Sequence, residues 1–186
     1  MRKLDSYIFV LKNFLDKKEC KETIKQLQDV KWEEHLFYNN PEKRYETRSG
    51  DKELDTTYSE IENHKIIMDK LHPAITAYLE NIKSNVFTQW AGYTYVRFNR
   101  YTKTKKMAEH CDHIHTIFDG KIRGVPILSI VGLLNNDFTG GEFYMDKKHI
   151  KLKAGDLLIF PSSFVCPHHV KSVQKGTRYS FVSWVY

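Results

Sequence analysis

The segment EHCDHIH, residues 109–115, decides how this chain folds and where its chemistry lies. Side chains two residues apart point to the same side of a β-strand. If the segment is a strand inside a barrel, His110 and Asp112 therefore converge on one point. One imidazole and one carboxylate make two of the three ligands of a facial triad, which holds Fe(II) on one side and leaves other positions open. The third ligand is expected to be a histidine on a distant strand.

Two adjacent histidines, His168 and His169, are the candidates for that third ligand. His168 shares a strand face with Val170, whereas His169 shares one with Lys171. The face that carries the apolar residue is expected to point inward. Alternation therefore assigns His168 to the site and His169 to the outside of the barrel.

Arg178 follows His168 and opens an apolar run that contains Phe181 and Trp184. This setting predicts a buried guanidinium, which is costly without a partner. No acidic residue lies near it in the sequence. A dicarboxylate ligand would supply the partner, because guanidinium and carboxylate form a planar, bidentate match.

Working outward, the second half of the chain has a hydrophobic period of two, with short apolar runs separated by turn residues. The predicted strands are residues 93–100, 107–115, 125–134, 142–145, 149–152, 156–160, 168–173 and 178–186. Strands of this number and spacing predict a sandwich or barrel of the jelly-roll kind, with helices packed on one outer face. The fold class is mainly β with N-terminal helices (α+β).

The first half of the chain begins with a predicted strand at residues 7–11. Asp16, followed three residues later by Glu19, is typical of a capping box at a helix start. Residues 33–57 are polar and are predicted to be a long loop, which in a compact domain is usually functional or mobile.

A second helix is predicted to start at Ser59, with Glu62 completing a capping box. Pro73 is expected to kink or break this helix. Its buried stripe is expected to consist of Ile67, Leu71, Ile75, Tyr78 and Ile82.

Composition restricts the class of protein. The chain has 186 residues and a mass of 22.0 kDa, and its 41% hydrophobic and 13% aromatic content excludes disorder as the main state. No stretch approaches the roughly 20 apolar residues that cross a bilayer. The apolar run near the N-terminus is too short for a signal-peptide core. We therefore expect no membrane association and a cytoplasmic location.

Cysteine count and charge narrow the choice further. Three cysteines without paired spacing predict neither a disulfide framework nor a four-thiolate zinc site. The role of Cys111, which lies between two expected ligands, is left open. The formal net charge of +6 suits an acidic partner without requiring nucleic acid.

Taken together, these features resemble the Fe(II)- and 2-oxoglutarate-dependent oxygenases, specifically the prolyl 4-hydroxylase-like branch and its compact bacterial and phage members. The resemblance covers most of the chain. Its matching segments are residues 9–15 with 19–20, Tyr101, the Gly-Gly-Glu turn at 140–143, residues 154–162 and residues 168–184. It implies a double-stranded β-helix (jelly-roll, cupin-like) over residues 86–186. Residues 1–85 would supply helical support and a substrate loop within one domain, 1–186.

The resemblance also implies roles for individual residues. His110, Asp112 and His168 would ligate Fe(II), and Arg178 would hold the distal carboxylate of 2-oxoglutarate. Tyr101 is expected to contact this cosubstrate. Ser180 is expected to add a hydrogen bond to its carboxylate, and Trp184 to line the pocket. O2 is the second cosubstrate, and ascorbate is the expected reductant.

The substrate implied by the resemblance is a prolyl residue in a peptide or protein, hydroxylated with release of succinate and CO2. The segment 33–57 occupies the place where relatives carry a mobile loop over the substrate. Its candidate contacts, together with the preceding tryptophan, are Trp32, Tyr38, Arg44, Tyr45 and Arg48.

Two departures from the family pattern stand out. Collagen-type members have lysine where this chain has Arg178, and other branches have arginine. Some members also place an aromatic residue near the cosubstrate in the strand before the Leu-Asn turn. Residues 130–135 contain none, so the deep end of the pocket is expected to be shaped differently.

Two other functions are considered. A nucleic-acid demethylase of the same superfamily would suit Lys103, Lys105 and Lys106, but those enzymes have a second arginine shortly after the cosubstrate arginine, and none follows Arg178. A non-catalytic cupin could instead bind a metal or small acid as a sensor, and His113 and His115 could build a zinc site on the other strand face. The complete triad favours an enzyme.

Overall fold

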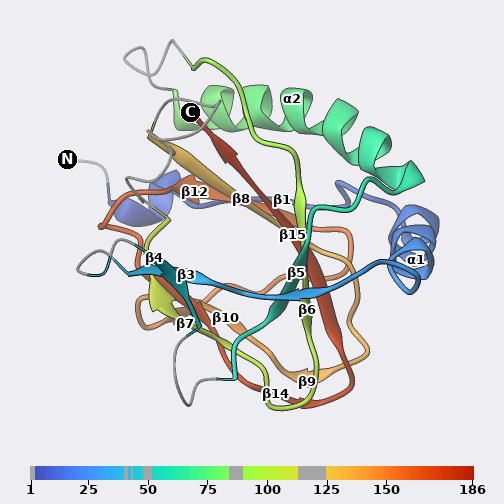
Figure 1. The fold of residues 1–186 in the computed structure, drawn as a ribbon. Coiled ribbons are helices and arrows are strands. Elements are labelled where there is room, and N and C mark those ends of the chain that lie inside the picture. The colour runs from blue at the N-terminus through green and yellow to red at the C-terminus, as the bar shows by residue number, and fades with distance from the viewer. Residues whose placement is uncertain (1–2, 40–41, 43, 48–51, 84–89, 113–124) are drawn as a thin grey trace.

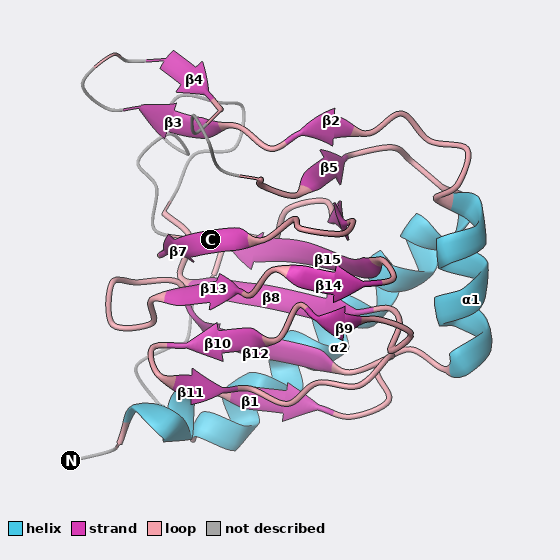
Figure 2. Cartoon of the chain, turned by 90° about the horizontal axis from the view of Figure 1, so that it is seen from below, coloured by secondary structure: helices cyan, strands magenta, loops and turns pink. Residues whose placement is uncertain are grey.

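The computed structural model describes residues 3–39, 42, 44–47, 52–83, 90–112 and 125–186. Two facing β-sheets form the body, and two α-helices flank it (Figure 1). In Figure 2 the strands β10, β11 and β13 of the smaller sheet lie in front of the larger sheet. This is the predicted double-stranded β-helix with helices on one side.

The larger sheet has seven strands in the order β1-β12-β8-β15-β6-β5-β2, all pairs antiparallel. Their bounds are β1 (Phe9–Leu11), β2 (Glu33–Glu34), β5 (Asp55–Thr57), β6 (Arg97–Tyr101), β8 (Leu128–Leu133), β12 (Leu157–Pro161) and β15 (Arg178–Val185). The longest strand, β15, lies at the centre. Within it Phe181 packs against Gly132 of β8, where an added Cβ would lie only 2.1 Å from the ring.

The smaller sheet has the order β11-β10-β13-β7. Its strands are β7 (Met107–His110), β10 (Phe143–Met145), β11 (Lys148–His149) and β13 (His168–Val170). Two separate ladders complete the fold, namely β9 (Thr139–Gly140) with β14 (Val173–Lys175), and β3 (Phe37–Asn39) with β4 (Arg44–Glu46). Pairing of β13 with β7 places His168 directly opposite His110.

The first helix, α1 (Lys17–Gln26), begins as predicted. Asp16 accepts from the backbone N–H of Glu19, and the Glu19 carboxylate accepts from the N–H of Asp16. A 3₁₀ turn, η1 (Leu4–Tyr7), occupies the start of the predicted first strand, so that strand begins only at Phe9.

The second helix, α2 (Glu62–Ile82), departs from the predicted start. Its N-cap is Ile61, without a side-chain cap, and Ser59 instead hydrogen-bonds to Thr57, so the predicted capping box is wrong. The helix runs without a break through Pro73. The predicted stripe from Ile67 to Ile82 is buried throughout. Among the described residues, no helix is long and apolar enough to cross a membrane.

The described parts of the polar segment 33–57 include four short strands, where the sequence predicted a loop. Strands β2 and β5 extend the larger sheet. On β5, the Asp55 carboxylate pairs with Arg100 of β6 and with Lys105. Backbone pairing and these ion pairs fix a segment that carries little hydrophobic signal.

Alternation along the strands separates two cores. One core lies between the larger sheet and the helices and includes Phe98, Phe181 and Ile75. The other lies between the two sheets and includes Tyr101, Phe143 and Phe160. The second core forms the inside of the barrel, and the candidate site lies in it.

Candidate active site

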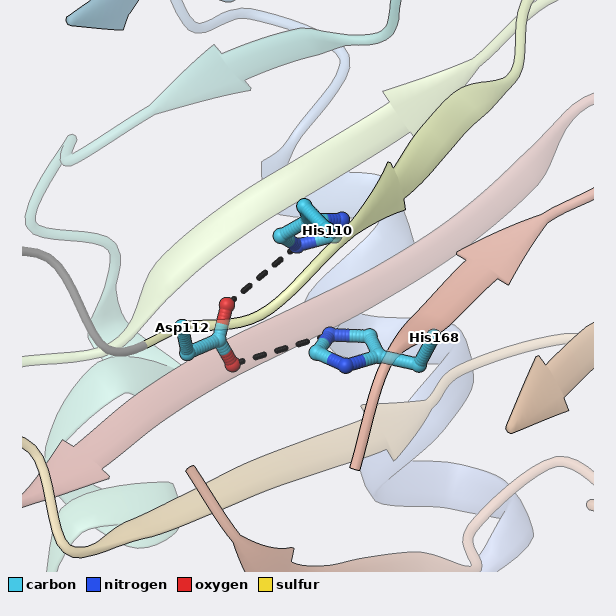
Figure 3. A group of neighbouring side chains, drawn as sticks. All are labelled: His110, Asp112 and His168. Atoms are coloured by element: carbon cyan, nitrogen blue, oxygen red, sulfur yellow. Dashed lines mark ion pairs between the residues drawn. The ribbon is translucent and has the colours of Figure 1, made fainter. Parts of the chain in front are cut away.

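The three predicted metal ligands come together between the sheets. His110 ends β7, Asp112 lies two residues beyond that strand, and His168 begins β13. The Asp112 carboxylate lies between the two rings, with Oδ1 3.2 Å from Nε2 of His110 and Oδ2 3.7 Å from Nε2 of His168 (Figure 3). One donor atom from each residue lies within 4.8 Å of the other two. His169 lies on the opposite face of β13, as alternation predicts.

The orientation of both imidazoles is fixed from behind. Nδ1 of His110 is 2.9 Å from the carbonyl oxygen of Ala108, and Nδ1 of His168 is 3.0 Å from that of Cys166. A carbonyl oxygen only accepts, so each Nδ1 donates its proton. With Nδ1 engaged in this way, each ring turns its Nε2 toward the Asp112 carboxylate. Such backbone hydrogen bonds are typical of metal-binding histidines.

The electrostatics of this cluster favour a cation at its centre. Burial raises the pKa of Asp112. The hydrogen bond from His110 and the two imidazoles lower this pKa by more than burial raises it, so the net pKa lies well below its usual range. Burial lowers the pKa of His168 and favours its neutral form. A neutral His168 presents a lone pair to a carboxylate, and a cation between them would remove the repulsion. Two imidazole nitrogens and one carboxylate fit Fe(II) in a facial triad.

Aromatic side chains hold His168 in a dry setting. Phe143 stacks on its ring at 5.4 Å between centroids, and Phe160 meets it edge-on at 4.9 Å. Behind Asp112 the hydroxyl of Ser129 helps to lower the carboxyl pKa, and Ser129 also hydrogen-bonds to Ser162 at 2.8 Å. These supporting residues were not predicted, although Phe160 and Ser162 lie in the family-like segment 154–162.

Arg178 is the second centre of the site. Its side chain is 1% exposed, its Nη1 donates to Oγ of Ser180 at 2.8 Å, and its guanidinium lies 4.9 Å from the ring centroid of Tyr101. Among the described residues no carboxylate forms an ion pair with it. The predicted Tyr101 and Ser180 are therefore neighbours of Arg178. Burial of a charge without a carboxylate leaves a natural place for an anionic ligand.

A glycine closes the wall beside Arg178. Gly141 has a φ of +67°, and an added Cβ would lie 3.1 Å from Cδ of Arg178. The Gly-Gly-Glu turn predicted from the sequence thus leaves room for the arginine side chain.

Trp184 lies on the same strand face as Arg178 and Ser180. The guanidinium carbon of Arg97 lies over the Trp184 ring, 5.2 Å from its centroid. Nε of Arg97 donates to Oδ1 of Asn99 at 3.2 Å. Arg97 and Asn99 were missed by the sequence analysis. Alternation back from Tyr101 along β6 would have found both, because they share its face.

Several residues predicted for functional sites lie away from the triad or outside the part of the chain that the structure describes. His113, His115 and Arg48 lie outside the described residues, as does the side chain of Tyr38. Trp32 packs against the body, where its indole N–H donates to the carbonyl of Leu27. In the predicted substrate loop, Tyr45 is exposed, and Arg44 is exposed and pairs with Glu46.

Comparisons with known proteins agree with this geometry. The model of the 2OG-Fe(II) oxygenase superfamily matches residues 96–186, which include all three triad residues and Arg178. A PKHD-type hydroxylase of Prochlorococcus marinus is 30% identical over 89 residues, or 46% of this chain and 39% of that protein. The match thus spans about two fifths of the relative's length.

Solved structures resemble the chain over nearly its whole length. A viral collagen prolyl hydroxylase from Paramecium Bursaria Chlorella virus-1, in complex with 2OG, has a TM-score of 0.68 at 16% identity and covers 96% of this chain and 94% of its own. A prolyl hydroxylase from Trichoplax adhaerens, in complex with a hypoxia inducible factor peptide, has a TM-score of 0.71 at 16% identity, covering 97% and 84%. At this identity the likeness establishes the fold.

Proposed function

We propose, from the premise that residues 96–186 belong to the 2OG-Fe(II) oxygenase superfamily, that this protein hydroxylates a C–H bond with Fe(II), 2-oxoglutarate and O2 as cofactor and cosubstrates. The expected target is a prolyl residue in a peptide or protein, and the expected products from the cosubstrate are succinate and CO2. The observation that carries the proposal is the convergence of His110, Asp112 and His168 on one point, with both imidazole orientations fixed.

Each part of the site has a task in this reaction. His110, Asp112 and His168 would hold the iron from one side. Arg178, oriented by Ser180 and Tyr101, would bind the distal carboxylate of 2-oxoglutarate. Bound iron and 2-oxoglutarate supply the oxidising chemistry, with ascorbate keeping the metal reduced. The aromatic wall around His168 excludes water from the reacting groups.

The prolyl substrate is supported by the names of similar proteins. The curated relative is called a PKHD-type hydroxylase, and both solved structures are prolyl hydroxylases, one of them with a bound peptide. The basic balance of the chain also suits a partner with acidic residues.

The test is succinate formation from 2-oxoglutarate by the purified protein with Fe(II) and ascorbate, with and without a panel of proline-containing peptides. We expect iron-dependent turnover that rises with a peptide and collapses in His110→Ala and Arg178→Ala. His169→Ala is the matched control, because it removes a histidine from the outer face of the same strand. Turnover indifferent to every peptide would contradict the prolyl substrate. Tight metal binding without turnover would favour the sensor function instead.

A further inference from the structure

Strand register fixes the order of the side chains along the inner face of the larger sheet. On the inner face of β15 the residues follow in the order Arg178, Ser180, Val182 and Trp184. Their Cα positions span about 20 Å from the first to the last, at the usual rise of a β-strand. Neighbouring β6 runs antiparallel, and places Tyr101 opposite Arg178 and Arg97 opposite Val182. The inner face therefore carries one buried arginine at the start of β15 and another toward its Trp184 end.

The metal ligands lie toward the Trp184 end. Trp184 pairs across the sheet with Ser129, and the Ser129 hydroxyl stabilises the Asp112 carboxylate. Phe160, which contacts His168, pairs with the same Ser129 on its other side. If 2-oxoglutarate spans the space between Arg178 and the metal, the substrate has to approach from the side of Trp184 and Arg97.

Arg97 is held in place, and no carboxylate of the described residues forms an ion pair with it. Its guanidinium lies over the Trp184 ring, and Nε is used by Asn99. In the described part of the chain it forms no ion pair, and its Nη atoms form no hydrogen bond. The other arginine within β6 is Arg100, on the opposite face, and it pairs with Asp55 at 3.0 Å. Of these two arginines, the one on the inner face has no carboxylate partner within the described ranges of the chain.

We propose that Arg97 is a substrate-binding residue that takes a carboxylate next to the oxidised residue, so that the substrate is an acidic peptide. This inference rests on the oxygenase function proposed above and adds the substrate class. A guanidinium that lies over a tryptophan ring, and whose Nη atoms form no hydrogen bond with the described residues, suits a bidentate carboxylate. A polyphosphate chain would require several cations, and nearby Arg100 and Lys105 are already committed to Asp55.

The carboxylate could come from an aspartate beside the target residue or from a peptide C-terminus, and three probes separate these sources. All are fluorescein-labelled glycine-proline peptides. The first has an aspartate next to proline and an amidated C-terminus, and the second has asparagine in place of that aspartate. The third has no charged side chain, but its free C-terminal carboxylate follows proline directly. Fluorescence anisotropy would measure their binding to the full chain loaded with Mn(II) and 2-oxoglutarate. This readout does not depend on turnover.

We expect one carboxylate-bearing peptide to bind about tenfold more tightly than the asparagine peptide, as for a charge-assisted hydrogen bond. Arg97→Gln should abolish this preference. Arg97→Glu should reverse it, so that a further peptide with lysine in place of the aspartate binds more tightly. Arg97→Lys, which keeps the charge, should retain part of it. Lys103→Gln makes the same charge change at an exposed site on the turn after β6, and should keep the full preference. Thermal melts would check that each variant is folded.

Equal binding of the charged and neutral peptides, or a preference that survives Arg97→Gln, would overturn the inference. So would tighter binding of a single-stranded oligonucleotide, or no binding of any peptide. In each of these cases, iron-dependent decarboxylation of 2-oxoglutarate by the wild type would still support the oxygenase function. Loss of that decarboxylation would count against the oxygenase function itself.

Discussion

The two faces of the smaller sheet carry histidines in opposite settings. On the inner face, His168 is buried among Phe143, Phe160 and Asp112. On the outer face, the next residue, His169, stacks on Tyr144 at 5.3 Å and lies 3.8 Å from the exposed carboxylate of Glu109. Identical side chains one residue apart thus differ in burial and in the partner of their nitrogen atoms. A candidate metal-binding histidine is therefore distinguished by the contacts that fix its ring and by the group that its second ring nitrogen faces.

The largest effect should come from removing the inner histidine. His168→Ala is expected to weaken Mn(II) or Fe(II) binding by about 100-fold or more, because changes even in residues that only support metal ligands cost about 10–100-fold. His169→Ala should change affinity less than about twofold. Isothermal titration of both variants under anaerobic conditions would measure the difference. Similar losses in the two variants would show that the faces are not chemically distinct.

Substitutions of the buried Arg178 and of the exposed Lys171 should differ in their effects almost as strongly. Arg178→Met is expected to weaken 2-oxoglutarate binding by at least about tenfold, because hydrogen bonds to charged groups contribute about 1.5–3 kcal/mol. It should also raise the thermal stability of the ligand-free protein, because it replaces a buried charge without a carboxylate partner by an apolar side chain.

Lys171 on the outer face provides the matched control. Its Nζ lies 4.4 Å from the Tyr144 ring centroid and is exposed. Lys171→Met should alter neither 2-oxoglutarate affinity nor melting temperature appreciably. A lower melting temperature in Arg178→Met would mean that its contacts with Ser180 and Tyr101 outweigh the cost of burying the charge.

The pH dependence of stability should reflect the burial of the inner histidine. Burial lowers the pKa of His168 in the folded protein, whereas in the unfolded chain it titrates near 6.5. Below that pH the unfolded state binds the extra proton, so the free energy of unfolding falls as pH decreases from about 7 toward 5.5. His64, whose pKa burial also lowers, contributes in the same direction.

Urea unfolding of the metal-free protein across that pH range would test this expectation. His168→Asn should flatten the dependence only in part, because His64 remains. A stability that rises on acidification would contradict the assigned neutral state of His168.

The smallest effect is expected from the aromatic stack on the outer face of the smaller sheet, which consists of Tyr144, His149 and His169. Tyr144 stacks between His149 and His169 across three strands. Tyr144→Ala should lower the free energy of unfolding by about 1 kcal/mol, the usual scale for cross-strand aromatic pairs. Metal and 2-oxoglutarate affinities should not change. Chemical denaturation together with metal titration would show whether the outer face affects stability alone.

The sequence predicted the inner site well because period-two alternation is a strong signal where one face is buried. It placed His168 on the inner face and His169 on the outer face, and it expected Arg178 to be buried, as the structure has them. Tyr101 was named from the family resemblance and not from alternation. The sequence reached Asp112 for an incomplete reason, because β7 ends at His110 and Asp112 lies beyond the strand.

The failures lie where tertiary contacts override local pattern. Strands β2 and β5 are polar and are ordered by pairing at a sheet edge, as in the pairs of Asp55 with Arg100 and Lys105. Pro73 lies inside an unbroken helix whose buried stripe packs on the larger sheet, and packing can compensate for a weakened turn. Arg97 was overlooked because a charged residue in a strand is normally assigned to the surface.

The central place of β15 has a consequence for how the chain reaches its fold. Its two neighbours, β8 and β6, precede it in the sequence and do not pair with each other. Before β15 is inserted, the larger sheet is therefore two separate halves, β1-β12-β8 and β6-β5-β2, each with an open edge. Insertion closes long sequence separations in one step, which is slow and exposes the halves to intermolecular pairing. The same step brings Arg178 against Tyr101, so the proposed cosubstrate site and the continuous sheet form together.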